Sequence, residues 1–181
     1  MSTPIILLAG GKSSRMGRDK TRLEFRGETL LDRALRRFSE HFDTVLVSVA
    51  AIPPLGDATL LPDLLPNLGP LSGLHAALSR FDSAFLVAAD MPLAEPELAS
   101  LIIAAGTGYD ACAATSDGHT EPTFAYYSRA VFPELLAAID RGDYSLHRLL
   151  SRVNANYVEI PAETLLNINW PDDYEKLLSG D

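Results

Sequence analysis

Apolar residues follow two patterns that alternate along the chain. Unbroken runs of leucine and β-branched residues, as in Ile5–Leu8, are typical of strands that are buried on both faces. We predict strands at residues 5–8, 44–49, 58–61, 110–114, 121–127 and 157–160, and a further strand in the stretch 83–93 that ends at Asp90. Apolar residues at helical spacing predict helices at 29–38, from Pro70 onward, at 95–105, 128–140 and 144–152, and at the C-terminus.

The order of these elements indicates the fold class. Strand, helix and strand in repeated succession predict an α/β protein with a mostly parallel central sheet. With 181 residues, the chain is expected to form a single domain over 1–181. Ligands of such sheets bind at the carboxyl ends of the strands, where Gly10 and Ser48 would both lie.

Composition and charge argue against several classes of protein. The chain is 47% apolar and 22% charged, as in ordinary globular proteins, and no apolar run approaches the roughly 20 residues of a membrane span. The formal net charge of −9 argues against a nucleic-acid surface, and the lack of a signal-like N-terminus favours a cytoplasmic protein. Cys112 is the only cysteine, so we expect neither an intrachain disulfide nor a cysteine metal site.

Positive charge is concentrated in the loop after the first strand. Gly10 and Gly11 let the backbone turn sharply and approach a ligand closely, because neither residue has a Cβ. The basic residues of the loop are Lys12, Arg15, Arg18, Lys20 and Arg22. Neither a Walker A loop nor a Gly-x-Gly-x-x-Gly turn fits the spacing of the glycines. The loop therefore predicts an anion site of another type.

Two aspartates are candidate ligands at the same edge of the sheet. Asp63 lies in a stretch rich in proline and glycine, and Asp90 stands at the end of the apolar strand predicted from Ser83. A carboxylate at the carboxyl end of a strand suits Mg²⁺, which prefers one or two protein carboxylates together with phosphate oxygens and water. The structural alternatives are that Asp63 caps a turn between two prolines and that Asp90 caps the next helix.

The charged loop is part of a longer motif. Residues 8–20 read Leu-Ala-Gly-Gly-Lys-Ser-Ser-Arg-Met-Gly-Arg-Asp-Lys. This resembles the Leu-Ala-Gly-Gly-x-x-x-Arg-Met-Gly-x-Asp-Lys signature of the molybdenum cofactor guanylyltransferases, relatives of the sugar-nucleotide pyrophosphorylases. Gly-Pro-Leu-x-Gly-Leu at 69–74, Asp-Met-Pro at 90–92 and Asn-x-Asn at 167–169 are similar to further motifs of that family. The resemblance implies a Rossmann-like, three-layer α/β/α sandwich of the nucleotide-diphospho-sugar transferase type.

The resemblance also implies an activity. The family transfers GMP from GTP to the terminal phosphate of Mo-molybdopterin, which gives molybdopterin guanine dinucleotide and pyrophosphate. Such chemistry depends on positioning and on charge neutralisation by Mg²⁺, and it needs no general base because the attacking phosphate is already ionised at pH 7. The implied partners are GTP, Mo-molybdopterin and, transiently, proteins that insert the finished cofactor, without nucleic acid or membrane.

Matching motifs assign roles to individual residues. Arg15 would hold the β- and γ-phosphates, and Lys20 would stabilise charge at the α-phosphate. Asp90 would be catalytic as a metal ligand, with Asn169 as a second ligand unless the two asparagines of this motif only cap the last helix. The residues implied for GTP binding are Leu8, Ala9, Gly10, Gly11, Lys20, Ser48, Asp63 and Asp90.

Alternatives within and outside the enzyme class stay open. In the family, a carboxylate such as Asp63 can accept from both N1–H and the 2-amino group of guanine. Relatives that use CTP usually carry Leu-Ala-Ala-Gly, so the paired glycines of this chain favour GTP over a cytidylyltransferase. A non-catalytic module that delivers GTP or the pterin could lose Lys20 or Asp90, and both are present. His119 and Glu121 could face the second substrate, although a loop histidine is more often simply solvated.

Overall fold

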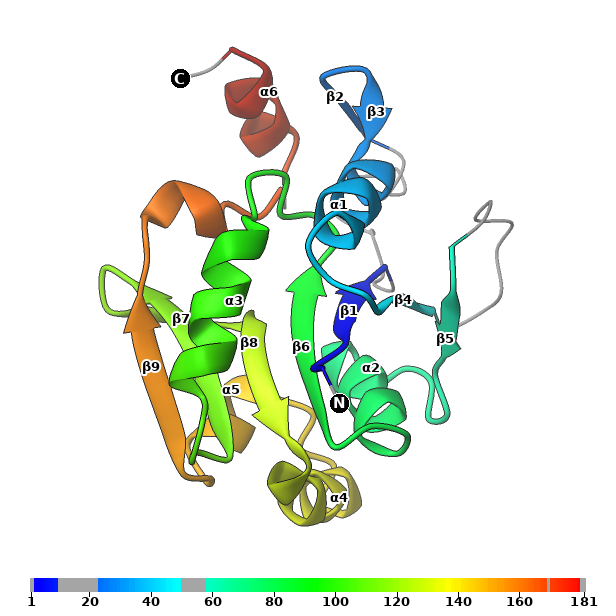
Figure 1. Ribbon diagram of the computed structural model, residues 1–181, viewed down its shortest axis with the longest axis vertical. Helices are drawn as coiled ribbons and strands as arrows, with labels where there is room; N and C mark the ends of the chain where they lie inside the picture. The colour runs from blue at the N-terminus through cyan, green and yellow to red at the C-terminus, as the bar shows by residue number, and fades with distance from the viewer. Residues whose placement is uncertain (1, 10–22, 50–57, 169, 180–181) are drawn as a thin grey trace.

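A seven-stranded sheet forms the centre of the molecule (Figure 1). The structure is a computed structural model that describes residues 2–9, 23–49, 58–168 and 170–179. Its strands follow the order β5-β4-β1-β6-β8-β7-β9. They are β1 (Ile5–Leu8), β4 (Val45–Val49), β5 (Leu60–Pro62), β6 (Ser83–Ala88), β7 (Ala111–Ser116), β8 (His119–Ser128) and β9 (Ala155–Glu159). Only β8 runs antiparallel to its neighbours in this sheet, so the predicted mostly parallel sheet is confirmed.

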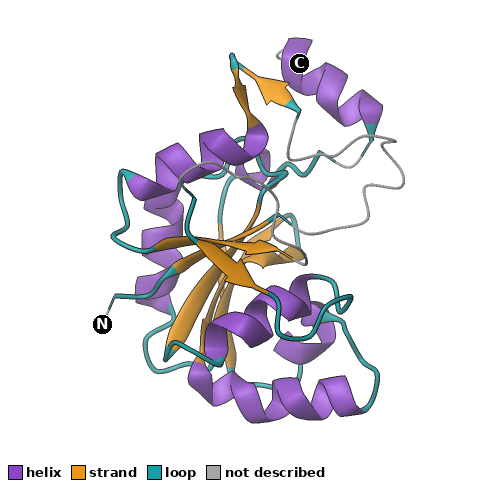
Figure 2. Cartoon of the chain, turned by 90° about the vertical axis from the view of Figure 1, so that its right-hand side faces the viewer, coloured by secondary structure: helices purple, strands orange, loops and turns teal. Residues whose placement is uncertain are grey.

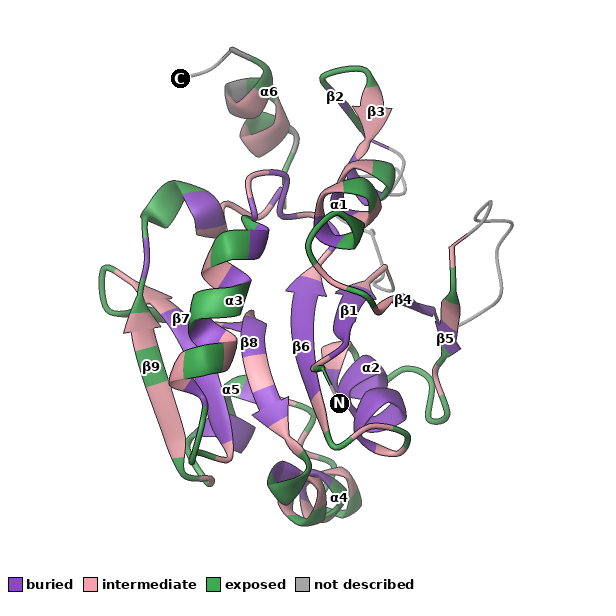
Figure 3. Ribbon diagram, in the orientation of Figure 1, coloured by how far each residue is buried: buried purple, intermediate pink, exposed green. Residues whose placement is uncertain are grey.

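Helices cover both faces of the sheet, which confirms the three-layer α/β/α sandwich (Figure 2). The first face packs against α2 (Pro70–Leu78), α4 (Phe132–Asp140) and α5 (Leu146–Leu150). The opposite face packs against α1 (Leu30–Ser39) and α3 (Pro96–Ala105). Burial follows the layers, since the inner strands β1, β4 and β6 are mostly buried, while the edge strand β9 and the outer sides of the helices are partly or fully exposed (Figure 3).

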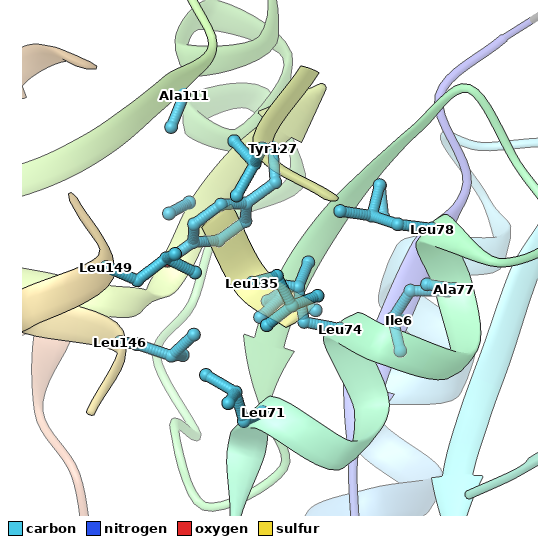
Figure 4. Close-up of a cluster of buried hydrophobic side chains, with 14 of the residues drawn as sticks. Ile6, Leu71, Leu74, Ala77, Leu78, Ala111, Tyr127, Leu135, Leu146 and Leu149 are labelled. Carbon is cyan, nitrogen blue, oxygen red and sulfur yellow. The ribbon is translucent and has the colours of Figure 1, made fainter. Parts of the chain in front are cut away.

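Strand β1 shows why the unbroken apolar runs form the inner layer. Successive side chains of a strand point to opposite faces, so a strand covered on both sides must be apolar at every position. Ile6 packs in the cluster formed with α2, α4 and α5, part of which Figure 4 shows, and Ile5 and Leu7 pack in the cluster formed with α1 and α3. All three side chains are fully buried.

A small unit lies beside the sandwich. The hairpin of β2 (Glu24–Phe25) and β3 (Glu28–Thr29) packs near α6 (Pro171–Ser179) through a third apolar cluster. Its turn residues Arg26 and Gly27 have positive φ angles of 54° and 83°, as a two-residue turn of type I′ requires. The sequence patterns did not predict this hairpin, because each of its strands contains only two residues.

The predicted helices differ from the observed ones mainly at their ends. The segment predicted at 128–140 begins as the short 3₁₀ helix η2 (Arg129–Val131), and α4 starts only at Phe132, where Pro133 suits the first turn. The helix predicted at 144–152 is the shorter α5, and a second 3₁₀ helix, η3 (Ala162–Leu165), precedes α6. The described helices include none that is long and apolar enough to cross a bilayer.

Candidate functional site

The carboxyl ends of β1, β4 and β6 meet at one edge of the sheet. The register pairs Leu8 of β1 with Ser48 of β4. Backbone hydrogen bonds extend this contact, because Ala9 N–H donates to the Ser48 carbonyl at 3.2 Å and Ala89 N–H donates to the Leu8 carbonyl at 3.2 Å. The first residues of the signature motif therefore lie between Ser48 and the segment that leads to Asp90.

Ser48 and Asp63 form a hydrogen-bonded pair at this edge. The Ser48 hydroxyl, which is only 3% exposed, donates to Asp63 Oδ1 at 2.7 Å. Burial raises the pKa of the Asp63 carboxyl, and the bond from Ser48 opposes that shift. Among the described residues, Asp63 Oδ2 has no hydrogen-bond partner. The carboxylate thus bonds to a serine hydroxyl rather than capping a turn, and it keeps acceptor capacity for a ligand.

Helix α2 approaches this pair closely at Gly73. A Cβ at that position would lie 2.7 Å from Ser48 Oγ and 2.6 Å from Leu8 Cδ2, which is too close for either contact. The helix begins at Pro70 directly after Gly69, whose φ of 62° suits glycine. The Gly-Pro-Leu-x-Gly-Leu motif therefore turns the chain and then lets the helix backbone pack against the ends of β1 and β4.

Asp90 lies in the loop between β6 and α3. Two arginines of α1 hold that loop from one side, since Arg33 Nε donates to the Pro92 carbonyl at 3.1 Å and an Arg37 guanidinium N–H donates to the Ala94 carbonyl at 2.7 Å. The N-cap residue of α3 is Glu95, so Asp90 does not cap that helix. The sequence analysis missed these arginines, although their i, i+4 spacing places both on one face of α1.

The segment before α6 reaches the Asp90 loop from the other side. Ile168 N–H donates to the Asp90 carbonyl at 3.0 Å. The neighbouring Asn167 side chain donates to Glu121 Oε2 at 2.9 Å and to the Leu165 carbonyl at 3.2 Å. Asn167 therefore does not cap the last helix.

The structure separates the two candidates for the second substrate. His119 is exposed, and its Nδ1 lies 3.0 Å from the carbonyl of Asp117 in its own turn. Glu121 is half-buried, and its carboxylate accepts from the Asn167 side chain. The proposed catalytic and binding residues Gly10, Gly11, Arg15, Lys20 and Asn169 lie outside the described residues.

The donors at this edge fit a hard metal ion that takes few protein ligands. The described part of the chain contains no group of three or more histidine, cysteine, aspartate or glutamate residues that could hold a metal. Asp90 supplies a carboxylate at the end of β6, next to a segment that ends in an asparagine motif. A carboxylate oxygen of this kind suits Mg²⁺ that is bound together with phosphate groups. The described residues do not form a zinc site of three or four histidine, cysteine or carboxylate ligands.

Comparisons with known proteins agree with this geometry. A family model described as the MobA-like NTP transferase domain matches residues 5–157. A protein of Thermococcus gammatolerans named probable molybdenum cofactor guanylyltransferase is 33% identical, and the match covers 96% of this chain and 98% of that protein.

Solved structures show the same fold. Molybdopterin-guanine dinucleotide biosynthesis protein A from Archaeoglobus fulgidus superposes with a TM-score of 0.88 at 27% identity, covering 98% of this chain and 97% of that one. A Mycobacterium tuberculosis protein in complex with manganese has a TM-score of 0.65 at 22% identity, covering 99% of this chain and 98% of that one. At that identity the second likeness concerns the fold alone.

Proposed function

This chain belongs to the family of MobA-like NTP transferase domains, and on this basis we propose that it transfers GMP from GTP to Mo-molybdopterin. The products would be molybdopterin guanine dinucleotide and pyrophosphate. The observation that best supports the proposal is the group of Leu8, Ser48, Asp63 and Asp90 at the carboxyl ends of adjacent strands. The names of the similar proteins from Thermococcus gammatolerans and Archaeoglobus fulgidus support the same substrates.

Asp63 would select the base. Guanine presents two adjacent donors, N1–H and the 2-amino group, and a carboxylate can accept from both. The Ser48 hydroxyl fixes Asp63 Oδ1 in place, while Oδ2 has no partner among the described residues. Adenine and cytosine lack this pair of donors, so the proposal predicts a preference for GTP.

The phosphates would bind at the motif that follows β1. The backbone at Ala9 begins this cradle, Arg15 would hold the β- and γ-phosphates, and Lys20 would stabilise the charge that develops at the α-phosphate. The attacking phosphate is ionised at neutral pH, so these residues need to orient the substrates and neutralise phosphate charge rather than transfer a proton. The whole chain, residues 1–181, would act as one nucleotidyltransferase domain.

Asp90 and Asn169 would hold Mg²⁺. The bound ion would neutralise phosphate charge and orient the reacting groups. The oxygen donors at the end of β6 support this assignment, and so does the manganese complex of the Mycobacterium tuberculosis protein with the same fold. Ile168, the neighbour of Asn169 in the chain, is hydrogen-bonded to the Asp90 carbonyl, which supports the pairing of the two residues.

The first test measures nucleotide binding and turnover together. Calorimetric titration with GTP, CTP, ATP and UTP, with and without Mg²⁺, is compared with formation of the dinucleotide from Mo-molybdopterin. We expect GTP to bind most tightly of the four nucleotides. Its binding should depend on Mg²⁺, and Asp90→Asn should weaken this dependence. Asp63→Asn should reduce the preference for guanine. Asp82→Asn is the matched control, because Asp82 precedes β6 at its opposite end.

Three other outcomes would contradict parts of this proposal. Preference for CTP would indicate the cytidylyltransferase of the same family. GTP binding without any transfer to Mo-molybdopterin would indicate a delivery module. Equal binding of all four nucleotides, unchanged by Asp63→Asn, would contradict the proposed base site.

A further inference from the structure

We propose that Glu121 is a positioning residue for the metal site, because its carboxylate holds Asn167 and thereby the segment that is hydrogen-bonded to the Asp90 carbonyl. The proposal rests on the assignment of Asp90 as a metal ligand under the proposed function. Glu121 would touch neither metal nor substrate.

Both oxygens of the Glu121 carboxylate are used within the protein. Oε1 accepts from the Thr123 backbone N–H at 2.9 Å and from the Thr123 hydroxyl at 2.5 Å. Oε2 accepts from the Asn167 side-chain amide at 2.9 Å. The bonds to Thr123 fix the orientation of the carboxylate, so the second oxygen presents a fixed acceptor to Asn167.

The same amide group of Asn167 also donates to the Leu165 carbonyl at 3.2 Å. Two acceptors therefore occupy its two N–H groups and fix the plane of the amide. The next residue, Ile168, donates its backbone N–H to the Asp90 carbonyl at 3.0 Å. Hydrogen bonds of the adjacent residues Asn167 and Ile168 thus connect β8 to the Asp90 loop.

An irregularity in β8 places Glu121 for this role. The register of β7 and β8 shifts between Ala113, which pairs with Ala125, and Ala114, which pairs with Glu121. Residues 122–124 therefore bulge out of the pairing with β7. The buried Tyr127 hydroxyl donates to the Pro122 carbonyl at 2.7 Å and so satisfies one backbone acceptor of the bulge. Bulges of this kind redirect side chains beside active sites.

The hydrogen-bond chemistry predicts what a substitution does. In Glu121→Gln, Thr123 presents two donors and would select the amide oxygen, which leaves the amide N–H₂ facing the N–H₂ of Asn167. The two donors repel, so the Asn167 segment loses its anchor although the shape of the side chain is preserved. Loss of such outer-shell partners typically weakens metal affinity or activity about 10- to 100-fold.

The test uses metal binding as well as turnover. Electron paramagnetic resonance of free Mn²⁺ gives the dissociation constant of the metal from the full-length protein with GTP. We expect Glu121→Gln and Glu121→Ala to raise this constant by about 10- to 100-fold.

Glu159→Gln is the matched control. Glu159 of β9 also accepts from a threonine hydroxyl and a backbone amide, from Thr115 at 2.8 Å and Asp117 at 2.9 Å, but it has no bond to the Asn167 segment. We expect its Mn²⁺ affinity and turnover to match the wild type. NMR of the Asn167 side-chain amide supplies a readout without metal, since its proton shifts should move in Glu121→Gln and not in Glu159→Gln.

Two results would overturn the proposal: wild-type Mn²⁺ affinity in Glu121→Gln, or equal losses of affinity in Glu121→Gln and Glu159→Gln. A wild-type protein that binds Mn²⁺ but does not transfer GMP would reject the proposed function alone. The Mn²⁺ and NMR measurements would still decide the role of Glu121.

Discussion

At the residue scale, burial of Asp63 and the hydrogen bond from the Ser48 hydroxyl act in opposite directions on the charge state of the proposed base site. Burial raises the pKa of Asp63, and the hydrogen bond from Ser48 lowers it. Only the ionised carboxylate accepts from both guanine donors, so GTP affinity should fall as the pH drops through the pKa of Asp63. In Ser48→Ala the opposing bond is absent, and we expect this fall to begin at higher pH.

Titration of GTP binding between pH 4 and 7 checks this expectation. Ser79→Ala is a control, because the Ser79 hydroxyl donates to the His75 carbonyl and, in the part of the chain that the structure describes, makes no other hydrogen bond. A loss of GTP affinity that begins at the same pH in Ser48→Ala and in the wild type would contradict it.

The raised pKa of Asp63 also affects stability. The folded state favours the protonated carboxyl, so Asp63 destabilises the protein at neutral pH, and this penalty disappears as the pH falls below its pKa.

At the same scale, sequence patterns located some site residues and missed others for a physical reason. Asp90 follows an apolar run directly, so its place at the end of a strand could be predicted. The partnership of Glu121 and Asn167 joins positions 46 residues apart and depends on a bulge in β8. Neither hydrophobic periodicity nor residue spacing contains that information.

At the scale of elements, α6 and the β2–β3 hairpin are joined by a hydrogen bond. The Tyr174 hydroxyl donates to the Glu24 carbonyl at 2.5 Å. Tyr174→Phe should therefore lower the free energy of unfolding by about 0.5–1.5 kcal/mol and speed proteolysis of α6. Urea denaturation and limited proteolysis measure both effects. The exposed Tyr144 provides the control variant Tyr144→Phe, and equal behaviour of the two variants would contradict the role of this bond.

The apolar cluster under this contact brings three functional segments together. Leu23 follows the signature motif, Leu93 belongs to the Asp90 loop, and Ile168 lies within the Asn-x-Asn motif. Packing among these residues connects α6 and the hairpin to the candidate site. The sequence patterns did not predict this connection. Strands with long apolar runs and amphipathic helices could be predicted correctly, because the spacing of their apolar residues determines which faces are buried.

The direction of β8 also had a signal in the sequence. Asp117 and Gly118 join β7 to β8, and both have positive φ angles, 50° and 75°. A two-residue Asp-Gly link is typical of a hairpin and forces the two strands to be antiparallel. The direction of β8 was not predicted, because the apolar runs that indicate a strand contain no information about its direction.

At the scale of the whole molecule, stability in acid should depend on Asp143. The side-chain hydrogen bond from Arg148, with Arg152 nearby, lowers the pKa of this carboxyl from 3.8 to about 2. A lowered pKa means that the ionised form stabilises the folded state above pH 3.8, and that this contribution is lost as the pH falls toward 2.

Asp143→Asn should therefore unfold more easily than the wild type at pH 7. The difference should shrink between pH 3.8 and about 2. Thermal unfolding across this range measures it, and Asp140→Asn serves as the control because Asp140 has no ion pair among the described residues. A difference that stays constant down to pH 2 would show that Asp143 acts through something other than its charge.

The position of β8 has a consequence for how the sheet is assembled. In the described sheet, β8 alone connects β6 to β7, although β7 comes earlier in the chain. The half-sheet β5-β4-β1-β6 can therefore form as soon as β6 has been synthesised, with β6 as an uncovered, apolar edge. Such edges invite pairing with other chains. We expect the β7–β8 hairpin, which its local turn can close early, to dock against β6 as one piece, so that a single event covers this edge before β9 pairs with β7.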